Sequence, residues 1–170
     1  RGGRNFRPPF FYLRVTVKLT KNFSLKEMTF SDTAIRKNIS NEPSIEEIVN
    51  LTNLCCEILQ PVRENFNRVV RINSGFRSAE LCKAIGSSPK SQHTKGQAAD
   101  FEIMGLPNSD LASFIYNNFD FDQLILEYHD PKIDINSGWV HCSYRKDGQN
   151  RKQSLIINKS TKGKYLPWKP

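Results

Sequence analysis

The sequence predicts an α+β fold: a small, mostly antiparallel sheet with helices packed on one side. A long segment with apolar residues at helical spacing comes early in the chain. Short segments in which apolar and polar residues alternate follow it, with helical patterns between some of them. Helices that precede and separate short strands in this way are typical of an α+β domain. A chain of 170 residues suggests one domain, or one domain with tails.

The elements before the long helix are short. Residues 1–10 combine arginine, glycine and proline with little to bury, and we expect them to be disordered. Apolar side chains then alternate from Phe11 to Leu19, which predicts a half-buried strand or an extended arm. Residues 23–28 predict a helical turn capped by Ser24.

The clearest helix begins at Ser44. Glu47 follows three residues later, which is the pattern of a capping box, and apolar residues then recur at helical spacing as far as Val62. Pro61 predicts an end or a kink nearby, because proline lacks the backbone donor that a helix needs. We expect this helix to be core scaffold without chemistry of its own.

The later elements alternate between strand and helix. Two helical patterns cover 78–85 and a segment that begins at Asn108, and 86–91 reads as a loop. In the strand that begins at Ala98, alternation places Asp100 on the opposite face from Phe101. The segments with a strand pattern are 69–73, 98–103, 121–128 and 138–144, with 154–158 as an edge strand.

The formal charge of +8 belongs to the two ends of the chain. Residues 1–26 hold seven Lys or Arg and no acid, and residues 145–170 hold eight together with Asp147. The middle holds ten basic and sixteen acidic residues. Basic ends favour polyanions such as nucleic acid, anionic lipid or the acidic polymers of a bacterial envelope, although solvated tails explain them equally well.

This charge distribution suggests three parts. We assign a basic N-terminal arm to 1–22, the central domain to 23–158 and a basic C-terminal tail to 159–170. No apolar run approaches the ~20 residues that a membrane helix needs, so we expect no membrane span.

The four cysteines form no metal or redox motif. Cys55 and Cys56 are adjacent, the other two are far apart, and there is no C-x-x-C. We therefore expect reduced thiols and synthesis in a reducing cytoplasm. The first residues also lack the apolar core of a signal peptide.

Two histidines and an aspartate carry the strongest chemical signal. His93 and Asp100 lie close in sequence, with Gly96 between them to let the chain turn, and His141 comes from a separate strand pattern. Two imidazoles and one carboxylate suit Zn²⁺ and leave a fourth position for water or substrate, as in catalytic zinc sites. The plainer alternative is two partly buried histidines and an ordinary turn or edge acid.

Three segments together resemble the zinc D-Ala-D-Ala carboxypeptidase family of metallopeptidases, and especially its small phage members. They are Ser91-x-His-x-x-Gly-x-Ala-x-Asp100, Trp139-Val-His-x-Ser143 and Ser74-Gly-Phe-Arg-Ser78. The resemblance implies a hedgehog/DD-peptidase-like fold and a zinc cofactor. It implies that the zinc ligands are His93, Asp100 and His141, that Arg77 stabilises the oxyanion and that Ser91 helps to position substrate.

The sequence departs from this family at the general base. Family members place an acid three residues before the last histidine, where this chain has Gly138. We take Glu127, on the strand pattern 121–128, as the base that replaces it, the alternative being an edge-strand surface acid. We rate His129 a bystander, and Cys142 should face away from His141.

The resemblance implies a zinc peptidase that cleaves amide bonds in the D-amino-acid-containing stem peptides or cross-links of peptidoglycan. We expect it to be phage-encoded, made in the host cytoplasm and active at the cell wall or periplasm, either free or in a virion. Its expected partners are peptidoglycan and other virion proteins, without specific nucleic acid. The competing hypothesis, supported by Gly138, is a non-catalytic wall-binding or virion module that retains the fold.

Overall fold

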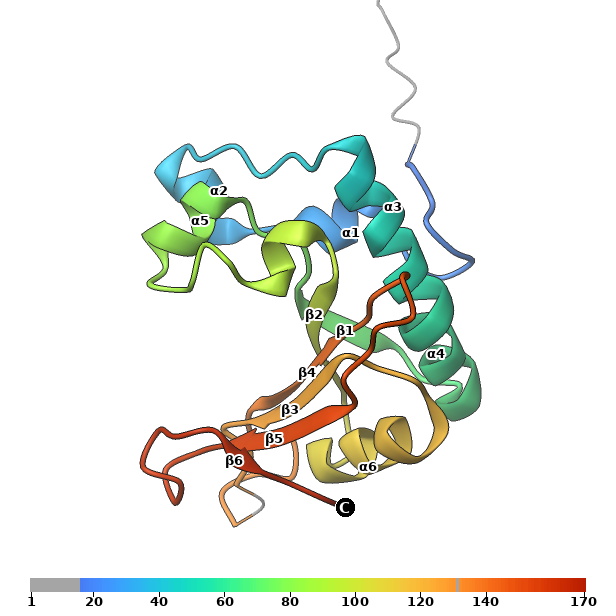
Figure 1. Cartoon of the computed structure of the whole chain (residues 1–170), viewed down its shortest axis with the longest axis vertical. Helices are drawn as coiled ribbons and strands as arrows, with labels where there is room; N and C mark the ends of the chain where they lie inside the picture. The colour runs from blue at the N-terminus through green and yellow to red at the C-terminus, as the bar shows by residue number, and fades with distance from the viewer. Residues whose placement is uncertain (1–15, 131) are drawn as a thin grey trace, which may run out of the picture.

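A mostly antiparallel sheet organises this protein, as Figure 1 shows. The computed structural model describes residues 16–130 and 132–170, so the expectations for residues 1–10 and for most of the segment 11–19 lie outside it. Within the described residues the sheet has six strands in the order β1-β2-β4-β3-β5-β6. Their bounds are β1 (Val70–Ser74), β2 (Ala98–Ile103), β3 (Gln123–Glu127), β4 (Trp139–Ser143), β5 (Gln153–Ile157) and β6 (Leu166–Pro167).

The sheet confirms the predicted fold class. All of its strand pairs are antiparallel except β3 with β5, and helices pack against it. The strand predicted at 154–158 is present as β5, but its predicted place at the edge of the sheet is wrong, because β6 pairs with its outer side. The segment 159–170, which we expected to be a basic tail, supplies this outer strand.

The long helix begins at Ser44 with the predicted capping box to Glu47. It runs through α3 (Ile45–Leu54), a π-helical turn at Cys55–Leu59 and α4 (Gln60–Phe66). Pro61 therefore does not end it. The ring of a proline clashes with the carbonyl four residues earlier, and the wider π-helical turn just before Pro61 accommodates that carbonyl.

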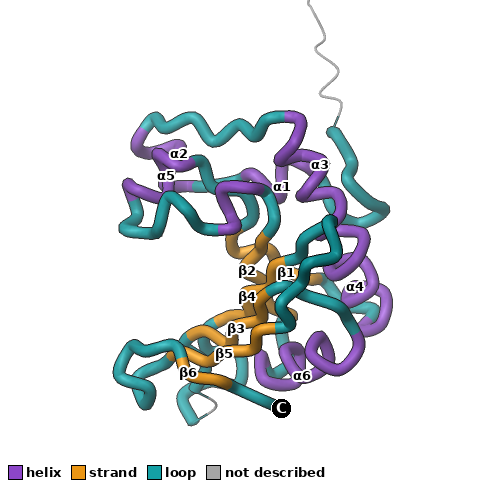
Figure 2. Tube along the Cα trace, viewed as in Figure 1, coloured by secondary structure: helices purple, strands orange, loops and turns teal. Residues whose placement is uncertain are grey.

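The shorter helices cap and pack as their sequences dictate. Figure 2 shows three of them grouped at one end of the molecule: α1 (Leu25–Thr29), α2 (Asp32–Lys37) and α5 (Ala79–Ala84). Ser24 caps α1 as predicted, whereas α2 was not predicted from the sequence. The last helix, α6 (Asn108–Asn118), packs on β2, β3 and β4. Among the described helices, none has the length and apolar character that crossing a bilayer requires.

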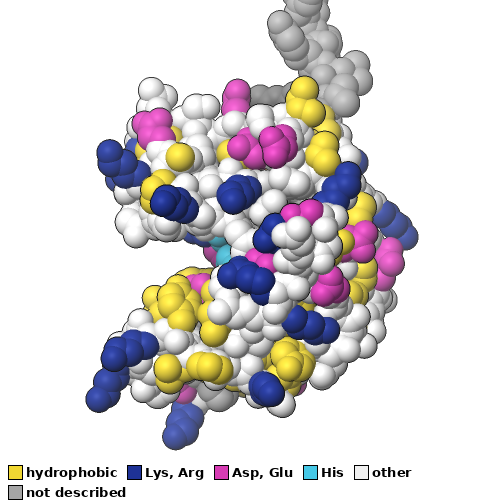
Figure 3. All heavy atoms as spheres, viewed as in Figure 1, with side chains coloured by type: hydrophobic (Ala, Val, Ile, Leu, Met, Phe, Trp, Pro, Cys, Tyr) yellow, Lys and Arg dark blue, Asp and Glu magenta, His cyan; other side chains and the backbone are white. Residues whose placement is uncertain are grey.

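Strand β2 separates the core from a cleft. All six of its residues are buried: one face packs in the core, and the other face contributes Asp100 to the cleft. Ala99 and Phe101 join the buried cluster that includes Leu51, Ile58 and Leu111. Asp100, between them, lines the cleft. Figure 3 shows this cleft as a deep notch between the helical end and the strands β5 and β6.

The contribution of the core to the free energy of unfolding can be measured by substitution. Ile58 is fully buried, so Ile58→Ala should lower the free energy of unfolding by about 2–5 kcal/mol through lost burial and the cavity left behind. Ile35→Ala is the matched control, because Ile35 is 68% exposed and its loss should change stability by less than about 0.5 kcal/mol. Urea unfolding of the two variants checks this, and equal effects would contradict the described core.

Candidate metal centre and catalytic cleft

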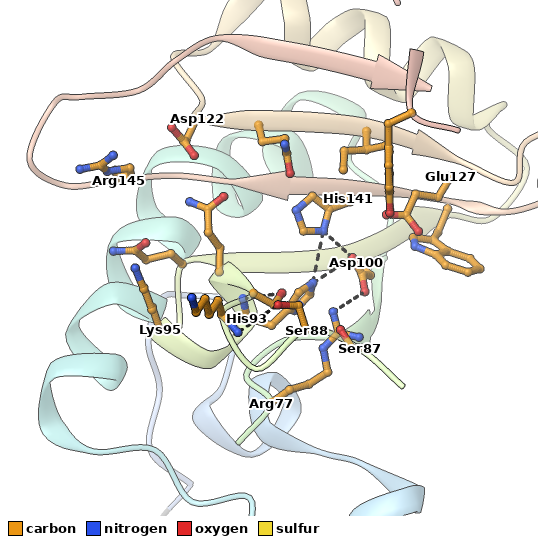
Figure 4. A pocket seen from close by; sticks show the side chains of 18 of the residues that line it. Arg77, Ser87, Ser88, His93, Lys95, Asp100, Asp122, Glu127, His141 and Arg145 are labelled. Carbon is orange, nitrogen blue, oxygen red and sulfur yellow. Dashed lines mark hydrogen bonds and ion pairs between the residues drawn. The ribbon is translucent and has the colours of Figure 1, made fainter. Parts of the chain in front are cut away.

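Three side chains from three elements converge at the floor of the cleft (Figure 4). Asp100 on β2 and His141 on β4 are direct cross-strand partners, so they share a face of the sheet. His93 reaches them from a 3₁₀ turn at Gln92–Lys95. Its Nε2 lies 3.2 Å from both His141 Nδ1 and Asp100 Oδ1, and His141 Nδ1 lies 2.8 Å from Asp100 Oδ1.

The hydrogen bonds of His93 set which nitrogen faces the cluster. Its Nδ1 lies 2.6 Å from the carbonyl oxygen of Gly75, so Nδ1–H must donate and Nε2 presents a lone pair. This lone pair, the second imidazole and a carboxylate oxygen then converge in a buried site. A ring proton or a metal cation between such close electron-rich atoms offsets their repulsion, and a set of two nitrogens and one oxygen fits Zn²⁺.

The electrostatics favour the metal-binding protonation states of His93 and Asp100. Burial lowers the pKa of His93, although Asp100 partly opposes this shift. Burial would raise the pKa of Asp100, but the adjacent His93 and His141 outweigh it and hold that pKa below its usual range. A neutral imidazole and an ionised carboxylate are the forms that bind a metal.

Gly96 ends the turn that carries His93, as the sequence suggested. It has a positive φ of 65°, and a Cβ there would overlap the carbonyl oxygen of Glu47 in α3. The Asn50 side chain on the same helix donates to the carbonyl of Lys95 at 2.9 Å. The long helix thus packs against the backbone of the turn that carries His93, an approach that only glycine permits at position 96.

Arg77 lies in the same cleft, on the segment between β1 and α5. Its Nη2 is 3.5 Å from Asp100 Oδ2, and its backbone N–H donates to the carbonyl of His93. The side chain is mostly buried, and its Nε has no hydrogen-bond partner within the described residues. The guanidinium is therefore fixed beside the cluster with donor capacity left for a ligand.

Glu127 also faces the cluster, from the end of β3. It is not an edge-strand surface acid, because β3 lies between β4 and β5 and the side chain lines the cleft. Burial raises its pKa, and the negative charge of Asp100 raises it further. Its cross-strand partner is Trp139, whose indole N–H has no hydrogen-bond partner within the described residues.

The other residues considered from the sequence have simpler surroundings. Ser91 lines the cleft, but its hydroxyl oxygen accepts a 3.4 Å hydrogen bond from the backbone N–H of His93 and so caps the metal-binding turn. His129 contacts the carbonyl of Ser137 and is absent from the cleft lining. Cys142 is buried in the core cluster on the opposite face, and all four cysteines are free thiols.

Gly138 cannot carry the acid that the resemblance places there. Its φ is +70°, and a Cβ would overlap the carbonyl oxygen of Glu127 and lie 2.6 Å from the carbonyl carbon of Tyr128. The backbone of the segment after β3 therefore occupies the space that an acidic side chain would need. That same close approach brings the end of β3, with Glu127, beside the strand of His141.

Most residues of the cleft wall carry no signal in the sequence. The cleft has a volume of about 1000 Å³. Figure 4 shows the basic residues Lys95 and Arg145 on one side of the donor cluster and Glu127 on the other. The aromatic residues that line the cleft are Tyr128, Trp139 and Tyr165. Alternation with His141 could have placed Trp139 on this face, but nothing in the sequence signals Tyr165.

Residues 21–143 match the sequence model of the family Peptidase M15. The chain belongs to this peptidase family. The match contains the three donors, Arg77 and Glu127, and it ends with β4, so that β5 and β6 lie beyond it. No curated protein matches the chain. Membership confirms the resemblance to the zinc D-Ala-D-Ala carboxypeptidases and supports a metallopeptidase, with the His-Asp-His cluster as the place where such an ion would bind.

The constraint at Gly138 gives a direct test. Gly138→Ala should destabilise the M15 protein by clearly more than Gly148→Ala, because both have a positive φ but a Cβ at Gly148 meets open space. The control variant should cost about 1–2 kcal/mol of backbone strain. Thermal and urea unfolding measure the difference, and equal losses would show that the backbone approach described here is wrong.

The donor cluster predicts one tight zinc site per chain. His93→Ala should weaken zinc binding at least about 100-fold, since even the loss of an outer partner of a ligand costs 10–100-fold. His129→Ala removes a buried histidine outside the cluster and should leave zinc affinity unchanged. Competition with a chromogenic chelator measures both affinities. Zinc binding that survives His93→Ala, or that is lost equally in the control, would refute this site.

Proposed function

We propose that this M15 protein is a zinc-dependent peptidase that hydrolyses amide bonds of bacterial peptidoglycan, in stem peptides or cross-links that contain D-amino acids. One observation carries the proposal: the His-Asp-His cluster shares a single cleft with an arginine on one side and a half-buried glutamate on the other. This is the set of groups that metal-assisted amide hydrolysis requires.

Each protein group has a defined task in this reaction. Zinc, when bound, acts as a Lewis acid and lowers the pKa of the attacking water. Glu127 accepts a proton from that water and delivers it to the departing amine nitrogen as the C–N bond breaks, which yields a carboxylate and an amine. The raised pKa of Glu127 suits a group that must take up and release a proton.

Arg77 stabilises the negative charge that develops on the carbonyl oxygen. It is held beside Asp100 before substrate binds, so little reorganisation is needed during the reaction. A fixed cation in a site that excludes water stabilises a nearby negative charge more strongly than the same cation does in bulk solvent.

The charges of the cleft support a peptidoglycan substrate. Stem peptides carry free carboxylates, and the basic residues Lys90, Lys95 and Arg145 line the cleft. Figure 4 shows Lys95 and Arg145 on the side away from Glu127. We extend the proposal to the origin and setting of the protein: a phage-encoded enzyme for lysis or wall penetration, whose basic ends favour the anionic envelope.

The central experiment uses purified sacculi. Zinc-loaded protein should release new amino groups and soluble muropeptides, and a chelator should abolish the release until zinc is restored. Mass spectrometry of the fragments identifies the bond and distinguishes carboxypeptidase from endopeptidase. Binding to sacculi without any release would favour the non-catalytic wall-binding module and refute the peptidase.

The assignment of Glu127 has its own test. Glu127→Gln should lower kcat by about 10²–10⁴-fold, the usual contribution of a general base, while zinc affinity is retained. Glu80→Gln, an exposed glutamate on α5 outside the cleft, is the matched control and should keep wild-type activity. Amine release from a soluble stem peptide measures both variants, and full activity of Glu127→Gln would assign the base elsewhere.

A further inference from the structure

The chain beyond the family match returns to the active-site cleft. After β5, the turn around Thr161 leads to β6, whose Leu166 pairs with Ile156 and whose Pro167 pairs with Leu155. Trp168 then packs against the core, and its backbone N–H donates to the carbonyl of Ser154. These contacts hold a segment that is rich in lysine and otherwise exposed.

Tyr165 is the residue that this segment brings to the cleft. The backbone is held on both sides of Tyr165. The Lys164 N–H donates a hydrogen bond to the carbonyl of Thr161, and Leu166 begins β6. The side chain lines the same cleft as Glu127, and it remains 55% exposed, so a ligand in the cleft can reach it.

The Tyr165 side chain lines the same cleft as Asp100, His141 and Glu127. Burial raises the pKa of its hydroxyl, and the nearby acidic groups of Glu127, Tyr128 and Asp100 raise it further. The phenol therefore stays protonated at neutral pH and remains a hydrogen-bond donor. A hydrogen-bond donor held in the cleft can stabilise an oxygen that becomes negatively charged.

Tyr165 and Arg77 come from opposite walls of the cleft. Arg77 precedes α5 in the helical end of the molecule, whereas Tyr165 precedes β6 at the outer edge of the sheet. Figures 1 and 3 show these two parts facing each other across the notch. A peptide bound over the donor cluster would therefore meet a donor from each side.

We propose that Tyr165 is a substrate-contacting catalytic residue: its hydroxyl donates a hydrogen bond to the carbonyl oxygen of the amide under attack, opposite Arg77. The proposal rests on the peptidase function proposed above and adds to it a residue outside the family-matched segment. It also gives the segment 159–170 a role in the reaction, since β6 holds Tyr165 in place.

The contrast between two phenylalanine substitutions tests this role. Tyr165→Phe keeps the ring and removes the hydroxyl, and it should lower kcat/KM for a soluble D-amino-acid stem peptide about tenfold or more, as expected for a hydrogen bond to a charged acceptor. Tyr116→Phe is the matched control, because Tyr116 lies on α6 against Phe121 and away from the cleft lining. It should retain wild-type kcat/KM.

A second measurement separates catalysis from packing. A phosphinate analogue of the D-Ala-D-Ala dipeptide presents tetrahedral, negatively charged oxygens, and its affinity can be measured by titration calorimetry. Tyr165→Phe should weaken this binding about tenfold, while the melting temperature and the zinc affinity stay at wild-type values.

The outcomes distinguish this inference from the proposed function. Wild-type kcat/KM and wild-type phosphinate affinity in Tyr165→Phe would overturn the role of Tyr165 while leaving the peptidase intact. A loss of activity explained entirely by weaker zinc binding or a lower melting temperature would overturn it as well. Wild-type protein that releases no amine at all from zinc-loaded incubations would refute the peptidase function itself.

Discussion

The antiparallel pairing of β2 with β4 is the constraint on which the site depends. Its register places Asp100 directly opposite His141, and the interior position of both strands leaves one face to the core and the other to the cleft. A slip of one residue would turn either side chain into the core, so the burial of Phe101 and Val140 fixes the positions of the ligands. His93 lies outside the sheet, so its position depends on a separate turn. Gly96 ends this turn, and the long helix packs against it.

The packing of the segment after β3 against Gly138 also determines which position near the cluster can carry an acidic side chain. The close approach of the segment after β3 to Gly138 excludes any side chain there, and it also brings Glu127 to the edge of the donor cluster. The missing acid in the sequence is therefore compatible with a working site. Arg77, on the helical side of the cleft, forms an ion pair with Asp100 at the edge of the donor cluster.

Much of this structure could be predicted from local sequence. Local patterns predict the geometry that the structure shows in three places. They are the Ser44 capping box, the alternation around Asp100 and His141, and the spacing of His93 from Asp100. The remainder depends on contacts between distant segments. Neither the π-helical turn before Pro61, nor β6, nor the arrival of Tyr165 beside Glu127 has a local pattern, because each results from packing against residues far away in the chain.

The most direct test of the central claim is an anomalous difference map, recorded at the zinc absorption edge, from crystals of zinc-loaded protein. The account predicts one strong peak between His93 Nε2, His141 Nδ1 and an oxygen of Asp100, at about 2.0–2.2 Å from each, with a further position open to the cleft. A peak at the free cysteines, or a zinc ion bound elsewhere with these three side chains apart, would contradict it.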